Sequence, residues 1–80
     1  MEKHCKSSFD KYIILKIKEK RIEKGLSQSE LAAKLGVSSG FIGKIESLNT
    51  TSKYNLNHLN KLALIFSCSP KDFLPNNPIV

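Results

Sequence analysis

The sequence predicts an all-α fold, a compact domain of five short helices. Its 80 residues are enough for one domain with a single hydrophobic core. Apolar residues recur every three or four positions through most of the chain, which is the helical period. Serine, asparagine and glycine stand at the ends of these periodic segments, where helices start and stop.

The first helix is predicted over residues 9–24. Its apolar residues are Phe9, Ile13, Ile14 and Ile17, with Ile22 one step off the stripe, and the spacing of 9, 13 and 17 is helical. Gly25 follows, and we expect it to end the helix in a left-handed conformation. The preceding residues 1–8 are polar and have no period, so we expect a flexible N-terminal arm there.

The second and third helices are predicted to be short and close together. Ser27 and the glutamate three residues later form a capping box, which indicates a helix over residues 28–35. Gly36 ends this helix and supplies the positive φ that a tight turn needs. Ser38 is then expected to cap a helix over residues 39–46. Two helices joined by so short a turn with a glycine are typical of a helix-turn-helix.

The last two helices complete the predicted domain. Asn55 is suited to cap a helix over residues 56–66, which has one apolar face. The Ser-Pro pair at 69–70 begins a short fifth helix, since proline is favoured at a first helical position. Two further prolines stop any continuation. The domain is therefore expected over residues 9–75, followed by a tail over 76–80.

The charge balance favours a polyanionic partner. The chain has 13 Lys+Arg against 7 Asp+Glu, a net charge of +6. Nucleic acid is the commonest polyanion, although many small proteins are basic for solubility alone.

Other classes of function are disfavoured. Cys5 and Cys68 are far apart, and no Cys or His has zinc-ligand spacing, so no metal or other cofactor is expected. No nucleophile–base pair or pair of carboxylates stands out, so we do not expect an enzyme. Neither a signal peptide nor a membrane span is visible, which predicts a cytoplasmic protein without membrane contact.

Seven positions between residues 28 and 45 together make a strong helix-turn-helix signal. Ala32 is small, as a close crossing of two helices requires, and Gly36 allows the turn. The other five bury the shared apolar face: Leu31, Leu35, Val37, Ile42 and Ile45. Any one of the seven alone would be weak evidence.

These residues resemble the phage-repressor (Xre/Cro/CI) helix-turn-helix family. The resemblance extends from Ile13 to about Leu74 and is most specific over residues 21–32 and 35–38. It implies a compact five-helix, lambda-repressor-like domain that binds operator double-stranded DNA, usually as a homodimer on a near-palindromic site.

The resemblance also implies roles for individual residues. Gln28, at a helix start with Ser27, would contact a phosphate. The positions that face the bases would be Ser38, Ser39, Gly40, Gly43 and Lys44. Of these, Lys44 can donate to guanine, whereas the glycines offer no side chain, so DNA shape would carry part of the specificity. Arg21 and Glu46 match a pair that forms a structural salt bridge.

The segment after Glu46 departs from the family pattern of a glycine, a basic stretch and a proline. Its polar residues are candidate phosphate donors: Asn49, Thr50 and Lys53. Leu64 and Ile65 lie off the main apolar stripe of their helix and are candidates for a partner subunit.

The leading hypothesis is a sequence-specific transcriptional regulator, a repressor or autoregulator that inserts helix 39–46 in the major groove. Two alternatives stay open. One is an antitoxin or protein-interaction module of a toxin–antitoxin operon, with a toxin as partner. The other is a controller protein of a restriction-modification system.

Overall fold

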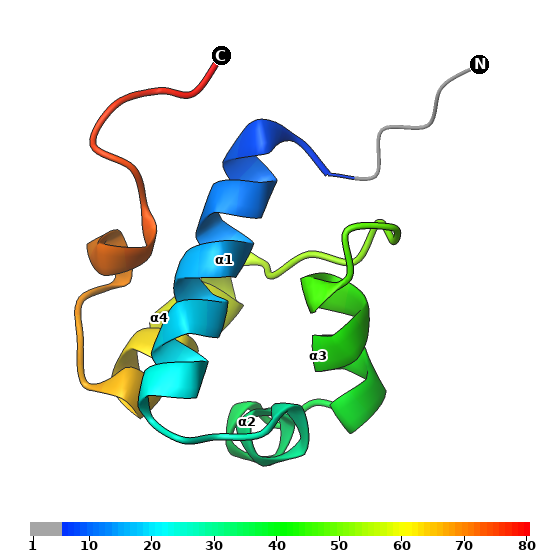
Figure 1. The fold of residues 1–80 in the computed structure, drawn as a ribbon. Coiled ribbons are helices and arrows are strands. Elements are labelled where there is room, and N and C mark those ends of the chain that lie inside the picture. The colour runs from blue at the N-terminus through cyan, green and yellow to red at the C-terminus, as the bar shows by residue number, and fades with distance from the viewer. Residues whose placement is uncertain (1–5) are drawn as a thin grey trace.

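The computed structural model describes residues 6–80. Over these residues the chain contains helices and no strand (Figure 1). The elements, in order, are α1 (Ser8–Glu23), α2 (Gln28–Leu35), α3 (Ser39–Glu46), α4 (Leu56–Phe66) and a 3₁₀ turn, η1 (Pro70–Phe73). Helix α1 packs against α3, α4 and η1, and α2 packs against α3 and α4.

The expected number of five α-helices is wrong by one over the described residues. Residues 70–73 form a single 3₁₀ turn, which Ser69 caps through its hydroxyl. Leu74 is extended because it precedes a proline, whose ring disfavours the helical conformation there. Phe73 is nevertheless fully buried, with its ring edge-on to Phe66 at a centroid distance of 6.2 Å.

Side chains cap three of the four α-helices at their starts. Ser7, Ser27 and Asn55 each accept a hydrogen bond from the backbone N–H three residues later, in reciprocal capping boxes. Helix α3 is the exception, because Ser38, which we expected to cap it, makes no side-chain cap hydrogen bond. The backbone N–H groups at the exposed start of α3 therefore have no acceptor from the Ser38 side chain.

Glycines end the first two helices. Gly25 has φ 69° and Gly36 has φ 83°, so both adopt the left-handed conformation predicted for them. The ammonium of Lys61 on α4 donates to the carbonyl of Leu35 at 3.1 Å, which satisfies a group at the end of α2.

One hydrophobic core lies between the helices. Its largest fully buried side chains are Ile17, Leu31, Ile42, Ile45, Leu62 and Phe73. Of the apolar residues expected along α1, Ile14 and Ile17 are buried, whereas Phe9 is 39% exposed. The first turn of α1 lies at the end of this helix that is far from α2, as Figure 1 shows.

The N-terminal boundary also differs from the expected one at Phe9. Ser8 already begins α1, Ser7 caps it, and Lys6 is buried. Ser7 and Ser8 thus belong to the start of α1, and Lys6 contacts the turn after α3. The rest of the expected arm, residues 1–5, lies outside the described residues. Within residues 6–80, no helix combines the length and the apolar character that crossing a bilayer requires.

Candidate nucleic-acid interface

Helices α2 and α3 form a helix-turn-helix at the edge of the molecule (Figure 1). On α3, Ile42 and Ile45 are fully buried against the core. Ser39, Gly40 and Lys44 are exposed on the other side of the same helix. One short helix therefore holds the motif in place with one face and presents a small, polar face to the outside.

The two glycines of α3 have different surroundings. A Cβ at Gly40 would meet nothing within 4 Å, so this position is open. A Cβ at Gly43 would lie 3.4 Å from the side-chain oxygen of Gln28 on α2. Gly43 thus gives room to the Gln28 side chain, whereas Gly40 leaves free surface.

A buried hydrogen-bond network fixes α3 relative to α1 and α2. Arg21 donates to both oxygens of Glu46, from Nε to Oε2 at 2.9 Å and from Nη2 to Oε1 at 3.0 Å. The two side chains are only 11% and 4% exposed. Arg21 Nη1 also donates to the carbonyl of Leu26 at 2.8 Å. A bidentate pair of this kind is geometrically specific, so it sets the orientation of α3.

Gln28 joins this network from the start of α2. Its Nε2 donates to Oε1 of Glu46 at 3.0 Å. An amide nitrogen carries two hydrogens, so one remains for a further acceptor. Because Gln28 is exposed, that acceptor can be an external group such as a phosphate.

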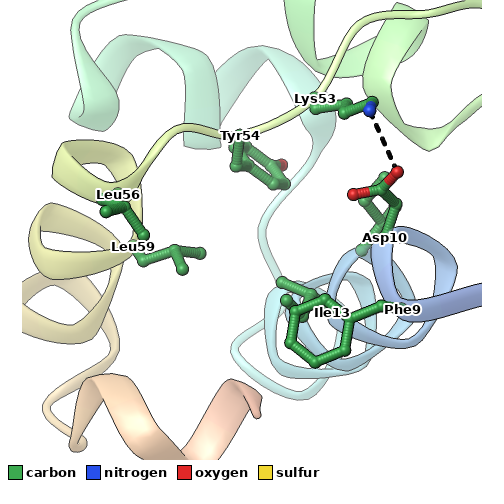
Figure 2. Close-up of a pocket in the computed structure, with 8 residues that line it drawn as sticks. Phe9, Asp10, Ile13, Lys53, Tyr54, Leu56 and Leu59 are labelled. Atoms are coloured by element: carbon green, nitrogen blue, oxygen red, sulfur yellow. Dashed lines mark ion pairs between the residues drawn. The ribbon is translucent and has the colours of Figure 1, made fainter. Parts of the chain in front are cut away.

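The other residues that we expected to contact phosphates differ in their exposure and in the contacts they already make. Ser27 and Asn49 are exposed. The Thr50 hydroxyl donates to the carbonyl of Lys44, so its hydrogen is already used. Lys53 is paired with Asp10 on α1, with Nζ and Oδ2 3.1 Å apart, as the dashed line in Figure 2 shows.

Three side chains near this surface carry features that the sequence did not reveal. The hydroxyl of Tyr54 is buried without a hydrogen-bond partner. Burial, together with the charge of Glu46 and against the effect of Arg21, raises the tyrosine pKa well above its usual value. Lys6 is buried at the end of α3, where it donates to the backbone of Ser47 and Thr50. Nothing in the local sequence distinguishes Lys6, because its partners are distant along the chain.

His58 is the third. It lies in the first turn of α4, where its Nδ1 accepts the N–H of Asn55 at 3.0 Å. Phe41 of α3 packs edge-on against its ring at a centroid distance of 5.6 Å. Burial, and then the charge of Lys61, lower the pKa of His58 below its usual value. In its neutral form, the histidine therefore links the start of α4 to α3.

A small pocket of about 190 Å³ lies between α1, the segment before α4, and α4 itself (Figure 2). Its wall is mostly apolar, and its two charged side chains, Asp10 and Lys53, pair with each other. Although burial acts to raise it, the pKa of Asp10 is lowered by hydrogen bonds from Ser7 and Lys53. Over residues 6–80, no group of three or more His, Cys, Asp or Glu side chains could hold a metal ion.

Several known proteins are similar to this chain. The restriction-modification controller protein C.AhdI from Aeromonas hydrophila is 26% identical, with a TM-score of 0.69, and the match covers 80% of this chain and 94% of that one. SinR, a master regulator for biofilm formation solved in complex with DNA, is 34% identical over 76% of this chain and 95% of its own, with a TM-score of 0.65. An HTH_3 family transcriptional regulator from Vibrio cholerae is 31% identical over 81% of this chain and 35% of that one, with a TM-score of 0.67.

Sequence comparison leads to the same family. No curated protein sequence matches the chain significantly. The model of the HTH_3 family, described as helix-turn-helix, matches residues 17–73, which include all of α2, α3, α4 and η1. The chain therefore belongs to the HTH_3 helix-turn-helix family, as the resemblance to phage repressors indicated.

Proposed function

We propose that this protein is a transcriptional regulator that binds a specific double-stranded DNA sequence by inserting α3 in the major groove. One observation carries the proposal. The exposed face of α3 is small and polar, and the Arg21–Glu46 pair and Gln28 hold it in a fixed orientation. A helix with such a face fits the major groove, and the net charge of +6 favours approach to DNA.

The base contacts are assigned to the face of α3 and its start. The residues are Ser38, Ser39, Gly40, Gly43 and Lys44. Lys44 carries the only charge among them and can donate to guanine O6 or N7. The Ser38 hydroxyl is not used as a cap and is free to donate. Gly40 has open space beside it, which allows the backbone to approach the bases closely.

Phosphate contacts are assigned around this face. Gln28 and Ser27 would bind one phosphate at the start of α2, where backbone dipoles favour an anion. A second phosphate would be bound on the other side of α3, by Asn49, Thr50 and Lys53. Because the Thr50 hydroxyl is occupied, we assign its contact to the backbone N–H. Lys53 would use the ammonium hydrogens that Asp10 leaves free.

We also propose that the protein acts as a homodimer in the cytoplasm. The exposed side of α4 carries Leu56 and Leu64, which are 83% and 75% exposed. A second copy would bury them and place two α3 helices on half-sites about 34–36 Å apart, one turn of DNA.

A controller protein of a restriction-modification system is a specific form of this function. The observation in its favour is the similarity to C.AhdI, which covers 94% of that chain. A restriction endonuclease or methyltransferase gene beside the gene for this protein would support this version.

The first test compares two duplexes by fluorescence anisotropy over several salt concentrations. One duplex is the DNA upstream of the protein's own gene, and the other is a scrambled duplex of equal length. We expect tighter binding to the native duplex, and a linear fall of log K with log salt concentration. Weak and equal binding to both would contradict autoregulation through that site.

Lys44→Ala tests the base contact. We expect the preference for the native over the scrambled duplex to fall about tenfold or more, because one good base contact is lost. Lys71→Ala is the matched control, since it removes the same charge from η1, which lies across α1 from α3 in Figure 1. An equal loss in both variants would mean that Lys44 supplies only general charge.

A further inference from the structure

Lys6 is a charged residue that is nevertheless buried, with 6% of its surface exposed. Its ammonium lies at the C-terminal end of α3. It donates to the carbonyl of Ser47 at 2.6 Å, to the carbonyl of Thr50 at 2.5 Å and to the Thr50 hydroxyl at 3.0 Å. These partners are 41 and 44 residues away in sequence, so the contact joins the start of the chain to the turn after the recognition helix.

The ammonium organises this turn. The Thr50 hydroxyl, which accepts from Lys6, donates in turn to the carbonyl of Lys44 on α3. Within the turn, the N–H of Asn49 donates to the Ser47 hydroxyl at 3.3 Å. Carbonyls at a helix C-terminus carry negative partial charge, so a cation is favourable there. The backbone from Lys44 to Thr50 therefore closes around one positive charge.

Lys6 does not have the geometry of a direct phosphate contact. An ammonium has three hydrogens, and the two carbonyls and the hydroxyl account for all three. A phosphate would have to displace one of these acceptors from a buried site. Lys44, in contrast, is exposed on α3.

We infer that Lys6 is a positioning residue for DNA binding, which holds the turn Ser47–Thr50 in the arrangement that meets the DNA backbone. The inference rests on the proposed function, since it assumes that this turn approaches DNA. A turn that is ordered before DNA arrives does not have to be ordered on binding, and this saves conformational entropy. Without Lys6, the two carbonyls lose their common donor and the turn samples other conformations.

The main variant is Lys6→Met, which keeps the length of the side chain and removes its hydrogen bonds and charge. Lys71→Met on η1 is the charge-matched control. We expect Lys6→Met to bind both the native upstream duplex and the scrambled duplex about tenfold more weakly, which corresponds to ordering about one backbone residue on binding. The salt dependence of binding should keep its slope, because no phosphate contact is lost.

Thr50 provides a second pair of variants. Thr50→Val removes the hydroxyl that links Lys6 to Lys44, whereas Thr50→Ser keeps it. We expect Thr50→Val to weaken binding as Lys6→Met does, and Thr50→Ser to weaken it less, because the serine hydroxyl keeps the link. The double variant that combines Lys6→Met with Thr50→Val should bind DNA no more weakly than the single variant that binds more weakly. The reason is that the two residues act as one unit.

Amide hydrogen exchange of the free protein separates this inference from the proposed function. In Lys6→Met we expect faster exchange at residues 47–50 and unchanged exchange in the buried part of α3 and α4. If the wild type binds neither duplex, the proposed function fails, whatever exchange shows. If the wild type binds and Lys6→Met binds equally well, the inference alone is overturned. A salt slope smaller by about one would also overturn it, because it would show a direct phosphate contact.

Discussion

At the residue scale, the site depends on a few side chains whose hydrogen-bond capacity is used almost completely. Glu46 accepts from Arg21 and Gln28, which belong to two different helices. A buried carboxylate is costly unless such donors surround it, and a buried pair is specific because few arrangements satisfy it. The orientation of α3 therefore depends on a polar contact within a mostly apolar interior.

Replacing one partner of the buried Arg21–Glu46 pair should lower the free energy of unfolding far more than replacing one partner of the more exposed Lys53–Asp10 pair. In Arg21→Met, Glu46 stays buried without its cation, and we expect the free energy of unfolding to fall by about 3–5 kcal/mol. In Lys53→Met, which breaks the more exposed pair with Asp10, the loss should be below about 1 kcal/mol. Urea denaturation followed by circular dichroism measures both. Equal losses would show that Arg21 contributes no more than a surface charge.

His58 should make stability depend on pH below neutrality. Its pKa is lower in the folded protein than its usual value of 6.5, so the unfolded chain binds more protons in the interval between the two values. The stabilisation by neutral His58 is thus complete above pH 6.5 and is lost as pH falls through the folded pKa. Urea denaturation between pH 5 and 8 should show this fall in the wild type.

The control for this effect is His58→Gln, which keeps a cap acceptor without a group that titrates in this range. His4 is present in both proteins, so its contribution cancels. A fall with pH of the same size in both proteins would assign the effect to groups other than His58.

At the scale of elements, the helix-turn-helix combines a rigid turn with an open recognition helix. Gly36 has φ 83°, which side chains with a Cβ rarely adopt, so the turn requires glycine. Gly40, in contrast, has helical geometry and free space around it. Glycine is thus required at Gly36 by the backbone conformation, whereas at Gly40 it leaves the outer surface of α3 free of a side chain.

Alanine at these two glycines should have opposite effects. Gly40→Ala should raise the free energy of unfolding by up to about 1 kcal/mol, because alanine loses less entropy in a helix, while its methyl group changes the proposed DNA surface. Gly36→Ala should lower it by more than about 1 kcal/mol, because of its positive φ. Thermal unfolding measures both changes. A destabilising Gly40→Ala would mean that the position is less open than its surroundings indicate.

At the scale of the whole molecule, one core supports both the DNA-facing side and an apolar outer surface on α4. Leu56 and Leu64 lie two helical turns apart on α4, so they belong to one side of the helix. Two such exposed leucines are more than single scattered apolar residues, and they suit an isologous contact in a symmetric dimer.

A dimer should therefore form and depend on this side of α4. We expect the wild type to sediment as a dimer at micromolar concentration, and Leu64→Lys to shift it towards the monomer because a charge would be buried in the contact. Leu15→Lys on α1, where the side chain is 49% exposed, is the control and should leave the dimer intact. A wild type that remains a monomer at high micromolar concentration would contradict this proposal.

Local sequence determined the helix boundaries and the turn. The Ser27 capping box, the Asn55 cap, the glycines with positive φ and the apolar spacing each act over a few residues, so they could be read directly. The capping box at Ser7 was not predicted, because residues 1–8 were expected to form a flexible arm. The number of helices was wrong where local signals compete. Ser69 and Pro70 do start a helical turn, but a second proline follows too soon for it to become an α-helix.

Tertiary structure alone decided which polar side chains surround the recognition helix. Lys6 meets the turn after α3, Lys53 meets Asp10 on α1, and the Tyr54 hydroxyl is buried near Glu46, all through long-range packing. The resemblance implied the Arg21–Glu46 pair, but the additional donor from Gln28 came from the structure. Capping and periodicity depend on neighbours along the chain, whereas these contacts depend on how the helices are packed, which no short segment encodes.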